Sequence, residues 1–518
     1  MRKNLRYYLS IITIVTTLLT GCGLSQDSQI GTTTVSTIAS QVVVDKEFTA
    51  RDLDVGYEES TATHIIFNGN DMNISGDGAT SKDGVLTISD EGIYVITGTL
   101  KDGQIVVDAE DNDKVQIVLN GVSITSLDNA PIYIKNADKT FITLKEKTEN
   151  TLTDGAQYAQ TDDNNVDGVI FSKADLTING DGTLNINGNY NYGIASKDDL
   201  IITGGTFNIT AVKDALNGKD CVKIKDGIFN LSATTGNGIQ SKNGDDTTKG
   251  YVYINGGDIT ISKSQEGIEG TAILIEDGKI NIKAEDDGFN AATGKSDTTE
   301  TSTTQLETNK TGTKQPGQPG QPGQSRPEGF GGGGGNSFEA DANCYISITG
   351  GTIIVDASGD GIDSNGGLYI SGGNIYVSGP TNSGNGGLDY NGTAEITGGT
   401  VVVSGSTGMA QGFSDSSSQY SILYNLTTAC EAGTEVKLTD KDGKVVAAYT
   451  PNKQYQSVVI STPGLTKDKT YTLTCGSQTS EITLSSVVTS NGQQGMGGRG
   501  ERGGQPGQDS MKKPEDGK

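Results

Sequence analysis

The sequence predicts an all-β protein whose main domain is a parallel β-helix, a solenoid with coils of about 22 residues, followed by a small C-terminal β module. Three observations predict this fold. A short apolar pattern with a paired glycine recurs through the middle of the chain, glycine is abundant at 74 residues, and apolar runs at helical spacing are missing after the first 20 residues. We therefore expect many short strands joined by tight turns.

The repeat reads apolar-x-Ile-x-Gly-Gly-x-apolar-x-apolar and runs from about residue 174 to 405, with clear copies at residues 200–209 and 368–377. Side chains alternate between the two faces of a strand, so the Ile points inward, and the glycines allow a sharp turn. Coils spaced roughly 4.8 Å apart would stack these side chains. The predicted buried column is Ile178, Ile202, Ile224, Ile254, Ile275, Ile348, Ile370 and Ile396.

The repeat spacing also sets the domain boundaries. Successive Ile residues of the column are 24, 22, 30, 21, 73, 22 and 26 residues apart, and the long gap contains a Thr/Ser-rich, Gln-Pro-Gly and poly-Gly segment. We predict a β-helix over residues 63–415 with a disordered insertion at about 293–342. Strand-like segments at 93–100, 115–122 and 132–136 are expected to form opening coils or a cap.

The C-terminal region lacks the repeat. Residues 416–488 are expected to form a small β-sandwich-like module, in which Asp440-Lys441-Asp442-Gly443 is a hairpin signature. Cys430 and Cys475 both fall in this module, and whether they form a disulfide is left open. The polar, Gly-rich tail over 489–518 has the composition of a disordered segment.

The N-terminus has the features of a lipoprotein signal peptide. Arg2, Lys3 and Arg6 precede a short apolar stretch that ends in Leu19-Thr20-Gly21-Cys22, which resembles a bacterial lipobox. We predict a signal peptide over 1–21, lipid attachment at Cys22, and a tether over 22–62. The protein is then extracytoplasmic, held at the cell membrane and cell surface through its N-terminal lipid.

The charge balance limits the possible partners. Cleavage after residue 21 removes three of the 38 basic residues and none of the 64 acidic ones, which leaves a formal net charge of −29. Such a surface repels nucleic acid and suits a divalent cation, although acidity also keeps secreted proteins soluble. No Cys-x-x-Cys occurs, which disfavours a zinc or redox site. The oligomeric state is not indicated.

A second motif, acidic-Gly-apolar-polar, lies between the repeats, where each coil turns. Stacked coils would bring such side chains within about 5 Å of one another, where carboxylates repel unless they protonate or share a cation. Calcium accepts six to eight oxygen ligands in flexible geometry. The predicted calcium ligands are Asp214, Glu266, Glu269, Asp286, Asp287 and Asn290. The alternative is ordinary turn chemistry with solvated acids.

Other outward columns are also predicted. Asn185, Asn208, Asn230 and Asn281 share one position in the second strand of the repeat, which favours a partial amide ladder over a sugar-facing surface. Candidate sugar-stacking residues, each with an ordinary surface role as the alternative, are Tyr253, Tyr369, Tyr190 and Tyr192.

The segments at 94–100 and 118–122, together with Lys-Asp-Ala-Leu-Asn-Gly at 213–218 and Gln-Glu-Gly-Ile-Glu-Gly at 265–270, resemble a family of bacterial surface carbohydrate-binding proteins. The resemblance covers about residues 60–485. It implies a right-handed parallel β-helix similar to family 9 pectate lyases, with bound calcium and affinity for cellulose and acidic polysaccharides such as pectin. It also implies binding rather than cleavage, so no catalytic residue is expected. The absence of Trp departs from typical sugar-stacking modules.

Three functions remain open from the sequence. The first is calcium-assisted, non-catalytic binding of polysaccharide. The second is a β-helix lyase acting on polyuronate, which needs calcium and a base; Lys213, Lys219 and Lys242 lie near turns, but nothing distinguishes them from surface lysines. The third is a structural or adhesive surface protein.

Overall fold

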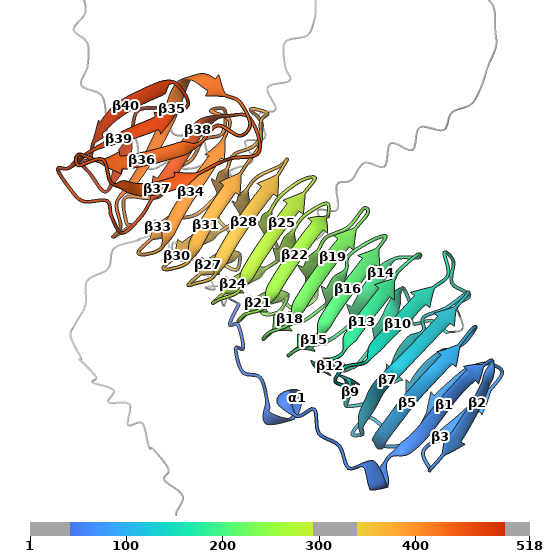
Figure 1. Cartoon of the computed structure of the whole chain (residues 1–518). Helices are drawn as coiled ribbons and strands as arrows, with labels where there is room; N and C mark the ends of the chain where they lie inside the picture. Colours follow the sequence, from blue (N-terminus) through green and yellow to red (C-terminus); the bar gives the residue numbers. More distant parts are fainter. Residues whose placement is uncertain (1–41, 161, 294–338, 493–518) are drawn as a thin grey trace, which may run out of the picture. The chain divides into compact units, whose positions relative to one another are not determined.

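The computed structural model describes residues 42–160, 162–293 and 339–492 (Figure 1). The signal segment, Cys22, most of the predicted insertion and nearly all of the predicted tail lie outside these residues. The described part is all-β apart from α1 (Ala50–Leu53) and the 3-10 turn η1 (Glu59–Thr61). Neither helix is long and apolar enough to cross a bilayer. The prediction of an all-β chain is confirmed.

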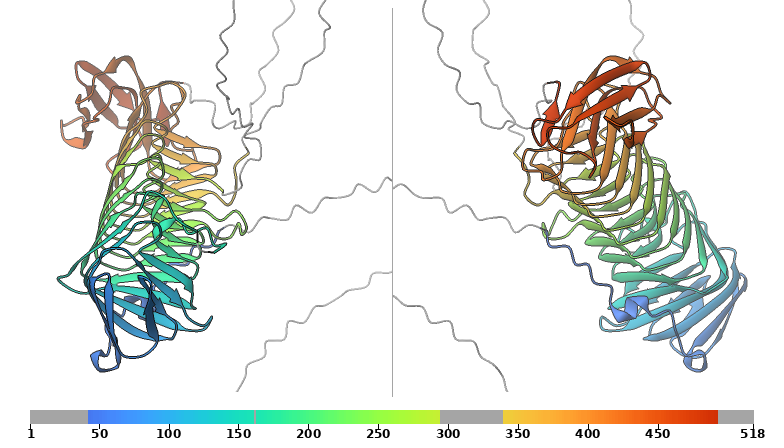
Figure 2. Two further views of the ribbon diagram at one scale, coloured as in Figure 1. Left: turned by 90° about the vertical axis from the view of Figure 1, so that its right-hand side faces the viewer. Right: turned by 60° about the vertical axis from the view of Figure 1, so that its left-hand side comes forward.

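Most strands belong to three parallel ladders, which the chain visits in rotation (Figures 1 and 2). We call three successive strands, one in each ladder, a rung. The first ladder contains β9 (Lys139–Leu144), β12 (Asp175–Gly180), β15 (Asp199–Ile202), β18 (Cys221–Ile224), β21 (Tyr251–Ile254), β24 (Ala272–Ile275), β27 (Tyr345–Ile348), β30 (Gly367–Ile370) and β33 (Ala394–Ile396). The second ladder contains β10 (Glu149–Asp154), β13 (Thr183–Asn187), β16 (Thr206–Ala211), β19 (Ile228–Ala233), β22 (Asp258–Lys263), β25 (Lys279–Ala284), β28 (Thr352–Ala357), β31 (Asn374–Ser378) and β34 (Thr400–Gly405). The third ladder contains β4 (Val85–Ile88), β6 (Gln104–Asp108), β8 (Ile132–Asn136), β11 (Gly168–Ser172), β14 (Tyr192–Ser196), β17 (Leu216–Gly218), β20 (Ile239–Ser241), β23 (Ile268–Gly270), β26 (Phe289–Ala291), β29 (Ile362–Ser364) and β32 (Leu388–Tyr390).

The predicted Ile column forms the register of the first ladder. Each of its eight members pairs with the next, from Ile178 opposite Ile202 to Ile370 opposite Ile396. All eight are fully or almost fully buried in one continuous apolar core. Ile275 pairs directly with Ile348 although 73 residues separate them in the sequence. The two rungs on either side of the insertion therefore stay in register.

The Asn column of the second ladder is a partial amide ladder, as predicted. The Asn208 amide donates to Asn185 at 2.8 Å, and the Asn230 amide donates to Asn208 at 2.9 Å. Thr260 takes the next position, so Asn281 is separated from the other three. The amide groups thus satisfy one another along the ladder, which favours their structural interpretation.

The predicted opening segments belong to the same ladders. β5 (Gly92–Leu100) and β7 (Lys114–Ser126) are long and each contributes to both the first and the second ladder. Four strands precede β5: β1 (Thr63–Gly69), β2 (Asp71–Ser75), β3 (Ala79–Lys82) and β4 of the third ladder. β1 pairs parallel with β5 and antiparallel with β2, which places a hairpin at the N-terminal end of the ladders.

The parallel ladders end where the C-terminal strands pair antiparallel. β38 (Tyr455–Ser461) pairs with β34 and with β35 (Ser421–Cys430), and β41 (Val488–Ser490) joins β35. A separate antiparallel sheet contains β36 (Val436–Asp440), β37 (Val445–Tyr449), β39 (Thr470–Cys475) and β40 (Gln478–Thr483). The predicted hairpin joins β36 to β37, and Cys430 and Cys475 are buried free thiols in the core of this region.

Residues 42–57, which we call the strap, lie along the outer face of the first ladder (Figure 1). The Tyr345 hydroxyl on β27 donates to the Val42 carbonyl at 3.2 Å, and the Arg51 guanidinium donates to Gln116 on β7 at 2.9 Å. The strap therefore spans the rungs from β27 back to β7 before the chain enters β1. These residues were expected in the tether from the sequence, and in the structure they pack against the ladder instead.

The strap packs there because the outward side chains of these rungs form an apolar strip. Val42, Val44 and Phe48 contact a strip that contains Cys221, Tyr251, Tyr253, Ala272 and Leu274. Farther along, the buried Asp52 carboxylate forms an ion pair with Lys139 at 2.8 Å and accepts a hydrogen bond from Thr177 at 2.6 Å. Burial alone would raise the pKa of Asp52, but these contacts lower it overall.

The Ile column yields a test of which side chains face the core. Ile275→Asp places a charge between Ile254 and Ile348, where it has no water and no partner, and should destabilise the fold by several kcal/mol. Thr260→Asp changes an outward side chain and should alter stability by less than about 0.5 kcal/mol. Thermal unfolding of both variants checks this, and equal losses would contradict the assignment of faces.

The amide ladder yields a second test. Asn208→Ala removes two side-chain hydrogen bonds at a partly exposed position, and the expected loss is about 1–2 kcal/mol in the free energy of unfolding. Asn281→Ala, at the equivalent position beyond Thr260, serves as the control and should change stability little. Urea unfolding measures both, and a loss in the control as large as in Asn208→Ala would argue against a contribution from the ladder.

Candidate functional site

The outward side chains of the third ladder change from apolar to polar along the chain. Val106, Tyr133, Phe171 and Ala195 pair in register near its start, where Tyr158 and Val166 cover them. Beyond Ala195 the same row of positions is polar, and we call this part the strand column. It contains Asn217, Gln240, Glu269, Asn290, Asp363 and Asp389.

A second row lies three residues earlier in each rung, at the turn before the strand. This turn column contains Asp214, Asn237, Glu266, Asp287 and Asp360. Its short side chains accept backbone N–H groups from the next rung: Asp214 from Asn237 at 2.8 Å, Asn237 from Glu266 at 3.0 Å and Asp287 from Asp360 at 2.6 Å. The Asp and Asn side chains therefore hold the turn through these hydrogen bonds. An Asp carboxylate uses one oxygen for this bond, and its second oxygen stays available for another partner.

The carboxylates at the start of the two columns have donors of their own. Glu269 is buried, forms an ion pair with Lys242, and accepts hydrogen bonds from Asn237 and Gln240. Asp214 accepts from the Asn217 amide at 2.7 Å as well as from the backbone. These two acids are satisfied by side chains of the protein.

Glu266 lies between these satisfied acids and the rungs that follow. It is one methylene longer than the Asp and Asn residues of its column, and it accepts a hydrogen bond from the Asn290 amide at 2.9 Å. Burial and the nearby charge of Glu269 raise its pKa to about 8. Proton release from Glu266 is thus opposed by its surroundings.

Three carboxylates converge on the following rungs. Oxygens of Asp287, Asp360 and Asp363 all lie within 4.8 Å of one another. Burial is the largest cause that raises their pKa values, to about 7, 6 and 8 respectively, and the neighbouring carboxylates add to it. Among the residues that the structure describes, none of the three has an ion-pair partner. We call Asp287, Asp360 and Asp363 the acidic triad.

The triad fits a hard divalent cation. Two oxygens bound to one calcium at 2.3–2.6 Å lie no more than about 5 Å apart, which the triad satisfies. The side-chain oxygen of Asn290, which pairs in register with Asp363, is buried and accepts no hydrogen bond within the described part of the chain. Buried acceptors seldom lack a donor, so an oxygen-seeking cation would also suit Asn290.

The structure brings together only part of the predicted calcium set. Glu266, Asp287 and Asn290 lie at or beside the triad, whereas Glu269 and Asp214 are held by other side chains. Asp286 is partly exposed and accepts from Gln265 at 3.3 Å. Asp360 and Asp363 were not in the predicted set, although the acidic-Gly-apolar-polar motif recurs at 360–363. The 73-residue gap concealed that this copy is the next rung after Asp287.

The four candidate sugar-stacking tyrosines have different surroundings. Tyr253 is only 2% exposed, stacks on Phe48 of the strap at 5.9 Å and donates to Glu276. It is therefore not an open platform. Tyr369, in the same column, is 39% exposed. Tyr190 stacks on Tyr158 at 4.4 Å, and Tyr192 has the amino groups of Lys197 and Lys213 near its ring.

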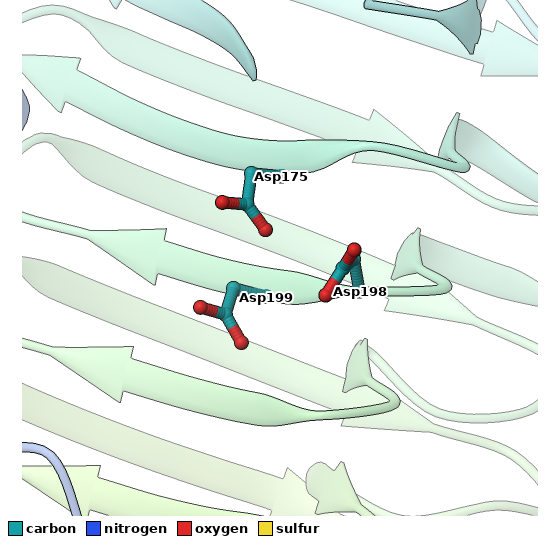
Figure 3. Close-up of side chains that lie close together, drawn as sticks. All are labelled: Asp175, Asp198 and Asp199. Carbon is teal, nitrogen blue, oxygen red and sulfur yellow. The ribbon is translucent and has the colours of Figure 1, made fainter. Parts of the chain in front are cut away.

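A second acidic cluster, which the sequence analysis did not identify, lies at the first ladder. Oxygens of Asp175, Asp198 and Asp199 also lie within 4.8 Å of one another (Figure 3). Burial and a hydrogen bond with Asp220 raise the pKa of Asp198 to about 6. In the sequence, a recurring Lys-x-Asp pattern at 173–175 and 197–199 could have indicated this cluster. Here the Cys221 thiol donates to Asp199 at 3.1 Å, and Lys249 binds Asp220.

Two comparisons match part of this chain to carbohydrate-binding domain-containing proteins. A family model described as "Carbohydrate-binding domain-containing protein" matches residues 82–318. A carbohydrate-binding domain-containing protein of Acetivibrio thermocellus is 40% identical over 150 residues, which are 28% of this chain and 52% of that protein. The chain thus spans about half the length of this relative.

Among solved structures, the gadolinium derivative of a polysaccharide lyase-like protein from C. thermocellum is 34% identical, with a TM-score of 0.39. The match covers 45% of this chain and 92% of that one. The match of the family model, residues 82–318, includes the third-ladder columns up to Asn290.

Proposed function

We propose that this protein binds acidic plant cell-wall polysaccharide of the pectin type, or cellulose, outside the cell, and does so without cleaving it. Calcium held by the acidic triad assists the binding. The single observation that carries this proposal is the convergence of Asp287, Asp360 and Asp363 without a basic partner in the described residues. The similarity of residues 82–318 to carbohydrate-binding domains supports a polysaccharide as the ligand.

The scaffold and its location complete the proposal. We propose that the three ladders close into a right-handed parallel β-helix, which is supported by their rotation along the chain and by the general preference for right-handed crossovers between parallel strands. We also propose that Cys22 carries a lipid that holds the protein at the cell membrane, because the N-terminal sequence resembles a lipobox.

Charge explains why a cation would be needed. The mature chain carries a formal charge of −29, and a polyuronate has the same sign. Bound calcium supplies positive charge and coordination positions that uronate oxygens can fill. The triad residues would hold the cation, and backbone N–H donors of Asp360 and Gly386 keep the carboxylates of Asp287 and Asp360 oriented. Binding of neutral cellulose should depend on calcium only to the extent that calcium stabilises the folded protein.

The surroundings of the candidate lyase bases favour binding over cleavage. Lys242 forms an ion pair with Glu269, and Lys219 forms one with Asp245 at 2.6 Å. The Asp245 carboxylate raises the pKa of Lys219, which is the opposite of what a general base requires. Lys213 lies over the Tyr192 ring.

One experiment separates the three functions. The purified protein is incubated with polygalacturonate and calcium, while retention on the polymer and absorbance of unsaturated products are followed together. Retention without product supports the proposed binding function. Formation of product supports a lyase, and the absence of both supports a structural or adhesive protein.

The triad predicts which substitutions affect calcium. Asp360→Asn together with Asp363→Asn removes two of three charges while conserving shape, and should lower calcium affinity at least tenfold and abolish retention on polygalacturonate. Asp286→Asn, one residue from Asp287 but partly exposed and outside the triad, is the matched control and should change calcium affinity far less, since its charge only adds to the field at Asp287 and Asp360. Isothermal titration with calcium measures both. Equal calcium affinity in the two variants would rule out the triad as the site.

The raised pKa values predict a dependence of stability on pH. Because the pKa values of Asp287, Asp360 and Asp363 are raised to about 7, 6 and 8, the folded state binds protons more tightly than the unfolded chain. In chelator, this contribution to stability is fully present below about pH 4 and is lost as pH rises through 6 to 8.

Calcium favours the ionised triad, so it should offset that loss. Melting temperatures measured from pH 4 to 9, with chelator and with calcium, check the prediction. In chelator the variant with Asp360→Asn and Asp363→Asn should lose much of the downward slope. A slope unchanged by these substitutions would place the titrating groups elsewhere.

A further inference from the structure

The strap covers a part of the first ladder where cationic and aromatic side chains point outward. Phe141, Lys223 and Tyr253 belong to one row of outward positions, together with Thr177, Ile201 and Leu274. Lys139 and Lys225 lie beside this row. Asp175 and Asp199 lie on the two strands between those that carry Lys139 and Lys223.

The strap pairs its carboxylates with the lysines of this face. Lys223 is almost fully buried, and its amino group binds the Asp45 carboxylate at 2.7 Å and the Glu47 carbonyl. Lys139 binds the Asp52 carboxylate at 2.8 Å. These two ion pairs lie three ladder spacings apart, from β18 to β9, which is roughly 14 Å.

An aromatic ring of the strap, Phe48, lies between Asp45 and Asp52 in the sequence and packs beside Lys223. Phe48 stacks on Tyr253 with the ring centroids 5.9 Å apart, and the amino groups of Lys223 and Lys225 each lie 5.4 Å from the Phe48 centroid. In sequence order the strap therefore presents the Asp45 carboxylate, the Phe48 ring and, from α1, the Asp52 carboxylate to two lysines and a tyrosine.

We propose that the strap occupies a second binding face, which fits an acidic polysaccharide chain and opens when the strap is displaced. Uronate carboxylates would take the places of Asp45 and Asp52 on Lys223 and Lys139, and a sugar ring would take the place of Phe48 on Tyr253. The ligand class rests on the proposed function, but the face does not. It presents Lys139 and Lys223 on the first ladder, with Asp175 and Asp199 on the strands between them, and it needs no calcium.

The strap is suited to reversible release. Its carboxylates return to water when it leaves, and Asp45 is already largely exposed. Six of the strap's residues from 49 to 56 are exposed. The extended continuation of the face beyond the strap, at Tyr369, is open to solvent.

The test uses the full mature protein with Asp45→Asn, Phe48→Ala and Asp52→Asn, which removes both ion pairs and the stacked ring. Val43→Ala, at a strap residue that is 83% exposed, is the matched control. Hydrogen exchange of residues 42–54 reports release of the strap. Binding to polygalacturonate is then measured in excess chelator, where the triad does not contribute.

The expected result is release of the strap and an affinity at least tenfold higher than that of the control in chelator, with the gain removed by adding Lys223→Gln. A released strap without that gain overturns the proposal. Continued protection of residues 42–54 in the triple variant also overturns it, because the strap is then a fixed part of the fold. Calcium-dependent retention in the unmodified protein is a separate readout, so failure of the triad and failure of this face are distinguishable.

Discussion

The parallel register of the rungs is the constraint on which the rest of the structure depends. Because each strand pairs with its counterpart one rung away, every position in the repeat becomes a row of side chains at interstrand spacing. The same geometry has three outcomes, according to the chemistry of the row. Ile side chains give a continuous core, Asn side chains hydrogen-bond to one another, and carboxylates are forced together.

The fate of each carboxylate follows from its neighbours in the row. Glu269 is next to two amides and Lys242, so its charge is compensated within the protein. Asp287, Asp360 and Asp363 have mainly each other, and burial raises their pKa values further. A row of acids without bases is costly to the apo protein. The carboxylates of these third-ladder rows therefore have the capacity to bind a cation. The Ile and Asn rows, whose side chains are already packed or hydrogen-bonded, do not.

The sequence predicted the features that repeat and missed those that depend on distant contacts. The Ile column, its register and the Asn ladder follow from spacing alone, and all are confirmed. The partnership of Asp287 with Asp360 was hidden because the insertion separates rungs that are adjacent in space. The strap was assigned to the tether because its partners, such as Lys223, lie more than 170 residues farther along the chain. A local pattern cannot indicate such a contact.

The strap also has a consequence for the order in which the protein assembles. Rungs contact their nearest neighbours, so pairing of each new rung can begin as soon as its strands have been synthesised. The strap precedes every rung in the sequence, yet its contact with Tyr345 joins residues 303 positions apart. That contact cannot form until β27, which carries Tyr345, has been synthesised. A segment that is synthesised early therefore completes its contacts late: the ion pairs with Lys139 and Lys223 need only β9 and β18, whereas the contact of Val42 waits for β27.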